Sequence, residues 1–383
     1  MAIENFQGNS NYREQVQTQQ KGNRFIFVIA MWLLSRLIIV AAMQLIAPLL
    51  YTSPVDADYK PPYPLDFVPG FVPKPSWELF SHWDGAWYRR VVTLGYEYVN
   101  DGQAHSIAFF PFFPLVIRGV MNLGLPFEVA GTLVNNLAFL GAMGVLYLWA
   151  EERYGISFAR WATAVLAWCP LSLCGTIIYT EGLFLLFTTA ALRAFDKHQH
   201  GWAALWGAMA TATRVTGAAL VPAFLLVAGR ERRPAIAYAA GLAAVGGLLV
   251  FSLYCAINFG DALAFVHVQQ VWQHQNWLDR LKSALNLDKP SLTRVVMLLG
   301  SGYLLWHLRR KLSRVAVAYG FCSLALLIIG GATLSFERYA YGIVSLSLGL
   351  GVLLARYPRW GYAVMGFFAI LLVQSAIRFA CWR

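Results

Sequence analysis

Residues 25–47, FIFVIAMWLLSRLIIVAAMQLIA, form an almost unbroken apolar run with one arginine, Arg36, inside it. About 20 apolar residues is the length that an α-helix needs to cross a lipid bilayer. Similar runs recur along the sequence, and 58% of the 383 residues are hydrophobic while only 13% are charged. Soluble domains carry about 25% charged residues. The sequence therefore predicts an all-α polytopic membrane protein.

The hydropathy pattern predicts a single transmembrane domain, residues 25–383, after a polar cytoplasmic tail, residues 1–24. The expected bundle has about 9–11 membrane helices, from spans at 25–47, 127–149, 158–177, 181–196, 201–214, 216–229, 234–257, 291–308, 314–334, 340–356 and 360–380. The two short pieces around Arg214 are expected to form a hairpin or broken helix, which a membrane tolerates where the backbone lines a protein cavity. Residues 108–124 contain two prolines and Arg118, so we expect them to lie along the interface or to dip in and out.

The distribution of charge predicts the orientation of the chain. With the N-terminus inside, the cytoplasmic tail and loops hold 16 Lys and Arg against 6 acids, and the rest of the chain is balanced except for Arg36. This distribution fits the positive-inside rule, so the net charge of +11 does not indicate a nucleic-acid partner. Two long external loops follow, residues 51–125 and 258–290. The five cysteines and the histidines show no metal-ligand spacing, so no cofactor is indicated, and a divalent metal stays open.

The first external loop contains the motif SHWDGAWYRR, residues 81–90. A proline-rich, extended stretch precedes it, and a short amphipathic helix is expected from Asp84 to a stop at Gly95. A carboxylate at the membrane surface could accept a proton from a sugar hydroxyl. A lipid-phosphate leaving group needs no proton, so one base could suffice, unlike the paired acids of glycoside hydrolysis. The alternative is that Asp84 only caps the helix.

Five motifs together resemble the PIG-V family of GPI mannosyltransferases. In order along residues 80–275 they are SHWDGAWYRRVVTLGYEY, AFFPFFPLVIR, CPLSLCGTIIYTEGLFLLF, TATRVTG and NFGDALAFVHVQQVW. The resemblance implies a GT-C architecture, a large first external loop bearing the catalytic aspartate at Asp84, and a polyprenyl-phosphate sugar donor. The chain departs from the family pattern where CPLSLCG has Cys-Pro for Asn-Pro and where TRVTG replaces Arg-Ser-Asn-Gly. A changed acceptor, lipid-linked or glycan, is therefore expected.

Further polar residues are candidates for substrate binding at the same face. Arg214 and Arg338 could bind a lipid phosphate, because guanidinium groups make charge-assisted bonds to phosphate. Glu181 could orient the acceptor. It could equally form an ion pair with Arg214, or be stabilised at the start of a helix by the positive end of the helix dipole. Asp261 could also be only a helix cap. The predicted substrate-binding set is His82, Trp83, Glu181, Arg214, Asp261, Gln270, Trp272, Arg338 and Tyr339.

The leading hypothesis is an inverting hexosyltransferase, a mannosyltransferase by resemblance, with Asp84 as general base. The chain has no Walker loop, Rossmann glycine pattern or DxD motif, which argues against a nucleotide-sugar donor. A lipid or sugar transporter or flippase, with Glu181 and Arg214 inside its pathway, is the alternative from another class. A lipid-linked glycan ligase or polymerase is the third hypothesis. The resemblance implies a bacterial plasma membrane with an outward-facing site, or the endoplasmic reticulum in a eukaryote, and leaves room for an accessory membrane subunit.

Overall fold

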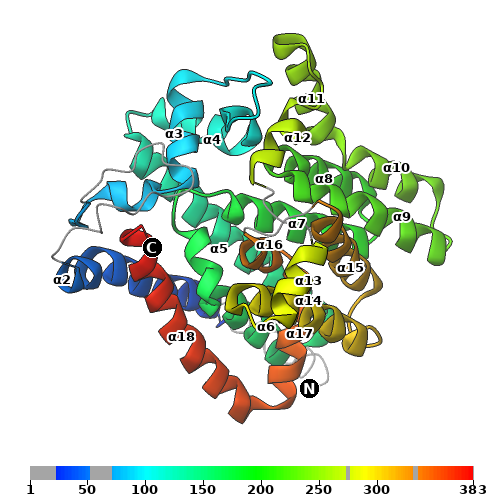
Figure 1. Cartoon of the computed structure of the whole chain (residues 1–383). Coiled ribbons are helices and arrows are strands. Elements are labelled where there is room, and N and C mark those ends of the chain that lie inside the picture. The colour runs from blue at the N-terminus through cyan, green and yellow to red at the C-terminus, as the bar shows by residue number, and fades with distance from the viewer. Residues whose placement is uncertain (1–22, 52–70, 273–276, 331–334, 383) are drawn as a thin grey trace, which may run out of the picture.

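Helices make up most of the chain that the structure describes. The computed structural model describes residues 23–51, 71–272, 277–330 and 335–382. Within these ranges there is no strand, which confirms the predicted all-α class. Figure 1 shows one bundle, in which the first helix, Asn23–Leu50, lies beside the end of α18.

The helices of the bundle are α5 (Phe127–Tyr154), α6 (Ile156–Trp168), α7 (Glu181–Asp196), α8 (His200–Thr213), α9 (Leu220–Arg230), α10 (Ala235–Ala243), α11 (Gly246–Phe259), α14 (Lys289–Leu308), α15 (Arg314–Ile329), α16 (Phe336–Tyr341), α17 (Val344–Arg356) and α18 (Pro358–Ala380). The first helix contains a π-helical turn, η1 (Ala42–Ile46), and ends in α2 (Ala47–Leu50). The two long loops at 51–125 and 258–290 contain α3 (Asp84–Leu94), α4 (Phe112–Met121), α12 (Ala264–Gln269) and α13 (Trp277–Leu285). Short 3₁₀ turns are η2 (Trp77–Ser81), η3 (Ser106–Ala108), η4 (Pro170–Gly175), η5 (Val215–Ala219) and η6 (Gln270–Trp272).

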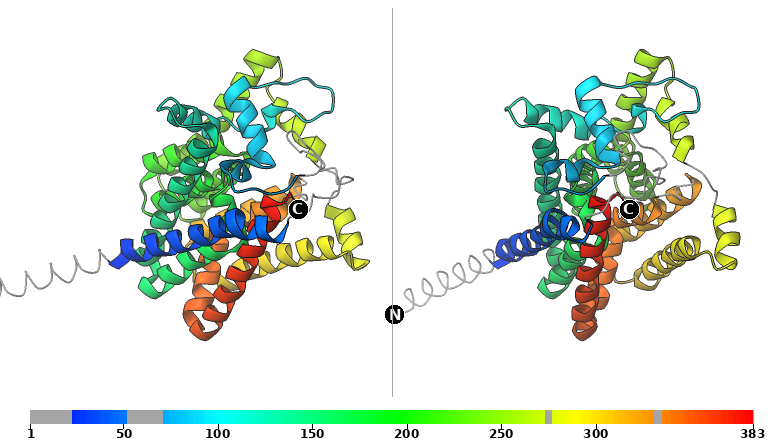
Figure 2. Two further views of the ribbon diagram at one scale, coloured as in Figure 1. Left: turned by 90° about the vertical axis from the view of Figure 1, so that its left-hand side faces the viewer. Right: turned by 60° about the vertical axis from the view of Figure 1, so that its left-hand side comes forward.

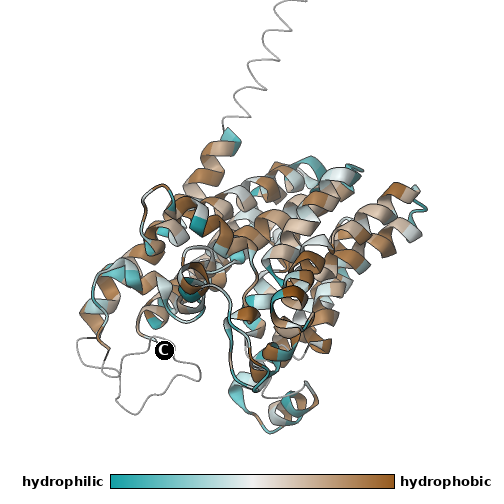
Figure 3. Ribbon diagram, turned by 90° about the horizontal axis from the view of Figure 1, so that it is seen from above, coloured by the Kyte–Doolittle hydropathy of each residue, from teal (hydrophilic) through white to brown (hydrophobic). Residues whose placement is uncertain are grey.

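Several membrane helices are shorter than the predicted spans. In the described part of the chain, Asn23–Leu50, α5 and α18 are each long and apolar enough to cross a bilayer, and α10 with α11 qualify as a pair bent by 40°. The span predicted at 158–177 is wrong in its second half, because α6 ends at Trp168 and η4 follows. Pro170 lacks the N–H that would continue the helix. Figure 3 shows hydrophobic residues along the helices and hydrophilic ones mainly at helix ends and in connecting loops.

Small residues let the central helices approach closely. Gly182 of α7 lies directly against the backbone of Asn135 in α5, and a Cβ at Gly351 of α17 would come within 2.8 Å of Ala162 in α6. Close approach through small residues is how membrane helices gain packing contacts without a hydrophobic driving force. The segment that leads into α7 is thereby held against α5.

The local predictions around the motifs agree with the structure. α3 begins at Asp84 and ends before Gly95, which has φ +90°. Arg214 is extended (φ −155°, ψ 144°) between α8 and η5, as expected for a broken helix. Within residues 108–124, α4 packs on α3 and α5. Figures 1 and 2 both show α3 and α12 at the same end of the bundle, so the two long loops meet there.

Candidate active site

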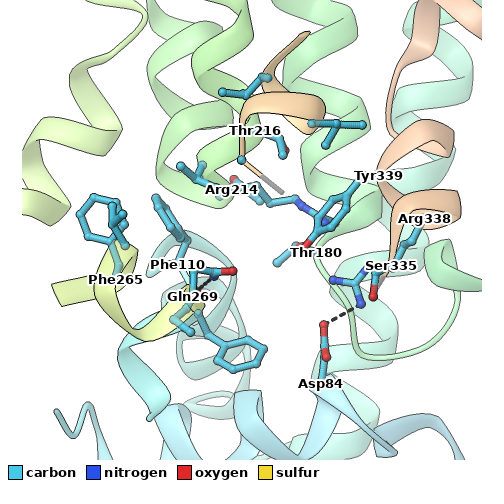
Figure 4. Close-up of a pocket in the computed structure, with 18 of the residues that line it drawn as sticks. Asp84, Phe110, Thr180, Arg214, Thr216, Phe265, Gln269, Ser335, Arg338 and Tyr339 are labelled. Atoms are coloured by element: carbon cyan, nitrogen blue, oxygen red, sulfur yellow. Dashed lines mark hydrogen bonds and ion pairs between the residues drawn. The ribbon is translucent and has the colours of Figure 1, made fainter. Parts of the chain in front are cut away.

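A cavity of about 260 Å³ lies where the two long loops, at 51–125 and 258–290, meet the bundle. Its walls come from α3, the loop before α4, the break between α8 and α9, α12, the end of α15 and α16 (Figure 4). Its charged and polar lining residues are Asp84, Tyr88, Thr180, Thr213, Arg214, Thr216, Gln269, Ser335, Arg338 and Tyr339. Of the described residues that line it, Asp84 is the only acid, and Arg214 and Arg338 are the only cations.

Asp84 presents its carboxylate to this cavity from the first residue of α3. Its Oδ2 accepts a hydrogen bond from Nη1 of Arg338 at 2.6 Å, and 28% of the side chain is exposed. No side chain caps the start of α3. The alternative that Asp84 serves as the cap is therefore wrong, and its carboxylate is directed to Arg338 instead.

Glu181 joins the two arginines behind the cavity. It is fully buried, and its Oε1 accepts a hydrogen bond from Nη1 of Arg214. Nε of Arg338 lies 2.8 Å from the same oxygen, as an ion pair without hydrogen-bond alignment. Together these residues form a chain of ion pairs, Asp84–Arg338–Glu181–Arg214, which we call the charge network.

Glu337, the residue next to Arg338, does not compete for it. Its carboxylate pairs with Nε of Arg294 at 3.0 Å. Arg338 is therefore left to the two acids of the charge network.

Aromatic rings support the two arginines. The guanidinium of Arg338 lies 4.7 Å from the ring centre of Tyr179, and that of Arg214 lies 5.0 Å from the ring centre of Tyr339. Such contacts stabilise a cation by about 0.5–2 kcal/mol, more where water is excluded. The rings thus hold the arginines in place while their N–H groups remain directed to the acids.

Two buried polar residues hold the segment that leads to Glu181. Nδ2 of Asn135 donates to the carbonyls of Cys174 (2.7 Å) and Ile177 (2.6 Å), and its Oδ1 accepts from N–H of Gly182 (2.8 Å). Arg36, the arginine of the first helix, donates in a similar way to η4 and its C-terminal cap, the carbonyl of Ser172 and the hydroxyl of Thr176. Irregular backbone inside a membrane needs such internal partners.

One wall of the cavity comes from residues that the sequence did not single out. Phe110 and Phe265 form an apolar surface, and the Gln269 amide beside them donates to the carbonyl of Ala108 at 3.3 Å (Figure 4). Tyr88 lies one helical turn after Asp84, and this i,i+4 spacing was the available signal for it. Phe110 belongs to the AFFPFFP motif, but the motif does not indicate which of its side chains face the cavity.

His82 and Trp83 do not line the cavity, although both belong to the predicted substrate-binding set. The His82 ring stacks on Trp382 with ring centres 4.3 Å apart, and Trp83 packs on the same ring at 5.2 Å. Burial lowers the pKa of His82 from 6.5 to about 4. A neutral His82 then donates from Nδ1 to the Phe379 carbonyl at 3.2 Å, because a carbonyl can only accept.

Asp261 also lies outside the cavity lining and connects the two long loops. Its Oδ2 accepts from the Tyr98 hydroxyl at 2.7 Å and lies 2.8 Å from Nδ1 of His267. Its Oδ1 accepts from the N–H of Leu263, the residue before α12, so Asp261 holds the turn that leads into this helix; no side chain caps the helix itself, and the cap alternative is wrong. The hydrogen bond from Tyr98 lowers the pKa of Asp261. Asp261 therefore has a structural explanation in full.

The last two predicted residues lie in η6, directly after α12. Gln270 does not line the cavity, whereas its neighbour Gln269 does. Trp272 ends η6, and its side chain lies outside the described part of the structure. Among the residues that are described, no three His, Cys, Asp or Glu side chains gather as metal ligands would.

Comparisons with known proteins agree with this architecture. A family model described as mannosyltransferase (PIG-V) matches residues 26–229. ArnT from Cupriavidus metallidurans bound to undecaprenyl phosphate is similar with a TM-score of 0.56 and 16% identity, over 89% of this chain and 62% of ArnT. The apo structure of the same ArnT is similar with a TM-score of 0.51 and 14% identity, over 88% of this chain and 62% of ArnT. This chain thus spans less than two thirds of the length of ArnT. No curated protein sequence matches the chain.

Proposed function

The chain belongs to the PIG-V family of mannosyltransferases, and from this membership we propose that it transfers a hexose, with mannose as the first candidate, from a polyprenyl-phosphate donor to a lipid-linked or glycan acceptor. The reaction takes place at the extracytoplasmic face and inverts the anomeric carbon. The observation that carries the proposal is one carboxylate, Asp84, facing a cavity that also contains Arg214 and Arg338. ArnT, the similar structure, was solved with undecaprenyl phosphate, which supports a donor of that chemical class.

In the proposed reaction Asp84 is the general base. It takes the proton of an acceptor hydroxyl while the acceptor oxygen forms a bond to the anomeric carbon and the bond from that carbon to the phosphate oxygen breaks. The aspartate becomes neutral. The donor, a singly charged phosphodiester, loses its sugar, and the carrier leaves as a doubly charged polyprenyl phosphate. No acid is needed for this leaving group, in contrast to glycoside hydrolysis. A single carboxylate in the cavity is therefore enough.

The arginines stabilise the charge that develops on the leaving phosphate. The reaction moves one negative charge from Asp84 to the phosphate, so a cation that contacts the phosphate gains in the transition state. Arg338 already contacts Asp84 at 2.6 Å and lines the cavity. Pre-arranged donors aimed at developing charge are usually the largest catalytic contribution. Arg214, held by Glu181, supplies the second cation.

The apolar wall suits substrates that remain partly in the bilayer. Phe110, Phe265 and Leu327 line the cavity together with the arginines. Aromatic faces can stack on a sugar ring or on the first isoprene unit of a lipid carrier. The position of the cavity beside the external loops favours a transferase over the transporter alternative, for which polar residues should line a path to both faces.

Asp84→Asn tests the proposal directly. The full-length protein in lipid nanodiscs is given radiolabelled polyprenyl-phosphate mannose and a lipid extract of the native membrane, and label transfer and donor binding are measured separately. We expect turnover to fall by about 10³-fold, within the range for loss of a general base. Donor binding should be retained or tighter, because Arg338 loses a competing carboxylate.

Asp261→Asn is the matched control, since Asp261 is an acid of the same face that does not line the cavity. It should keep turnover within a few-fold of wild type. Normal turnover by Asp84→Asn would show that this carboxylate is not the base and would refute the proposed mechanism.

A further inference from the structure

The backbone that leads into Asp84 is held in an unfavourable conformation. Trp83 has φ +57° and ψ −117°, a region that non-glycine residues rarely occupy. Residues of this kind cost about 1–3 kcal/mol and persist only where the surroundings enforce them. No side chain caps the helix start at this point. The orientation of Asp84 therefore depends on contacts from elsewhere in the fold.

Those contacts come from the end of α18. Trp382, which is 3% exposed, stacks on His82 with ring centres 4.3 Å apart and an interplanar angle of 26°, and it packs on Trp83 at 5.2 Å. The Phe379 carbonyl accepts the hydrogen bond from His82 Nδ1. Both residues before Asp84 thus rest on one segment, Phe379–Trp382, which we call the α18 clamp. Figure 1 shows the end of α18 beside the turn that leads into α3.

The α18 clamp also reaches the other half of the charge network. The Phe379 ring packs edge-on against Tyr179, with ring centres 5.9 Å apart. Tyr179 is the ring on which the Arg338 guanidinium rests. The same short segment therefore contacts the supports of Asp84 and of Arg338, the two residues that meet at 2.6 Å.

We infer that Trp382 is a positioning residue for the transferase reaction, which holds His82 and Trp83 so that Asp84 faces the cavity and Arg338. The inference rests on the proposed role of Asp84 as base. Trp382 does not line the cavity, so it acts through Asp84 and not through substrate contacts. A misplacement of about 1 Å in a reacting group can cost about 100-fold in rate, which sets the size of the expected effect.

The test compares turnover, donor binding and local backbone protection in variants of the full-length protein. Trp382→Ala should lower kcat about 100-fold while the donor Kd changes less than about threefold. Trp382→Phe keeps a ring in the stack and should recover most of the rate. Trp360→Ala is the matched control, because Trp360 lies in the same helix and is 72% exposed. It should behave as wild type.

Hydrogen exchange supplies a readout that does not depend on turnover. The amides of Gly85 and Ala86 donate to the carbonyls of His82 and Trp83, both at 3.1 Å. Loss of the α18 clamp should open this first turn of α3, so exchange in peptides covering residues 80–94 should accelerate in Trp382→Ala but not in Trp360→Ala. Peptides from α5 should exchange as in wild type.

The outcomes separate the inference from the proposed function. If Asp84→Asn is inactive while Trp382→Ala turns over and exchanges like wild type, the positioning role is refuted and the proposed function stands. If Asp84→Asn remains active, the proposed function itself fails. Should Trp382→Ala not fold, Trp382→Leu fills part of the volume without a stacking ring. A lower kcat at unchanged donor Kd in that variant supports the inference, and an unchanged kcat overturns it.

Discussion

Replacing Glu181 by glutamine should destabilise the protein more than any other single change of charge in the site. Glu181 is fully buried and is the acid that both Arg214 and Arg338 approach. Glutamine has nearly the same volume, so the change removes charge without leaving a cavity. Removing one partner of a buried ion pair costs about 3–5 kcal/mol, because the other charge stays buried without compensation. Arg214, at 8% exposure, is the residue left in that state.

Two other acids of the site set the scale for this effect. Asp84→Asn leaves Arg338 with Glu181, and the Asp84 side chain is 28% exposed, so a loss of about 1 kcal/mol or less is expected. Glu337→Gln removes the partially exposed pair with Arg294, for which a similar value of about 0–1 kcal/mol applies. Glu337→Gln is therefore the matched control, the same chemical change at the residue next to Arg338.

The assay is unfolding of the purified protein in mixed micelles by SDS titration. The double variant Glu181→Gln/Arg214→Gln should lose less stability than the sum of its single variants, because the second change removes the uncompensated charge. A coupling of about 2 kcal/mol is expected, within the range for residues of one ion-pair network. A loss below about 1 kcal/mol in Glu181→Gln, or strict additivity in the double variant, would refute the view that the buried carboxylate holds the arginines.

Two further predictions concern the supports of the site. Gly217→Ala should lower donor affinity by about tenfold, because a new Cβ would lie 2.9 Å from the Ala210 carbonyl and displace the break that carries Arg214. Affinity is measured by equilibrium binding of labelled polyprenyl phosphate. Gly229→Ala is the control, because the atom nearest to a Cβ at Gly229 would lie 3.7 Å away. Acidification should destabilise the wild type between pH 6.5 and about 4, because unfolded chains bind a proton on His82 in this range while burial keeps the folded pKa at about 4. In His82→Phe this part of the loss, measured by SDS titration at several pH values, should disappear, and an unchanged pH profile would contradict the assignment.

Local features of the site were predictable from the sequence. The start of α3 at Asp84 and its stop at Gly95 follow from nearby residues alone. The break at Arg214 follows from two apolar pieces that are each too short to cross. The length of the apolar runs and the composition predicted the membrane fold. What these features share is that their physical cause lies within one turn or one span.

Pairings across the fold were not predictable in the same way. Asp84 and Arg338 are 254 residues apart, and no local pattern distinguishes Arg338 from the other arginines near external acids. Gln269 lines the cavity instead of Gln270, because Gln269 shares a helical face with Phe265, four residues earlier in α12. Which face of α12 turns inward is decided by its packing against η3. His82 and Trp83 rest on Trp382, a contact that depends on where the last helix ends in space.

The balance of charge in the network bears on how a donor phosphate would enter the cavity. Two carboxylates and two guanidiniums cancel, so an added phosphate is an excess negative charge unless a carboxylate moves away. Glu181 is fully buried between both arginines, whereas Asp84 is partly exposed and contacts Arg338. Moving Asp84 from Arg338 therefore costs less than moving Glu181. Under the proposed function, the phosphate would take the place of Asp84 on Arg338, and the displaced carboxylate would then be free to accept the proton of the acceptor hydroxyl.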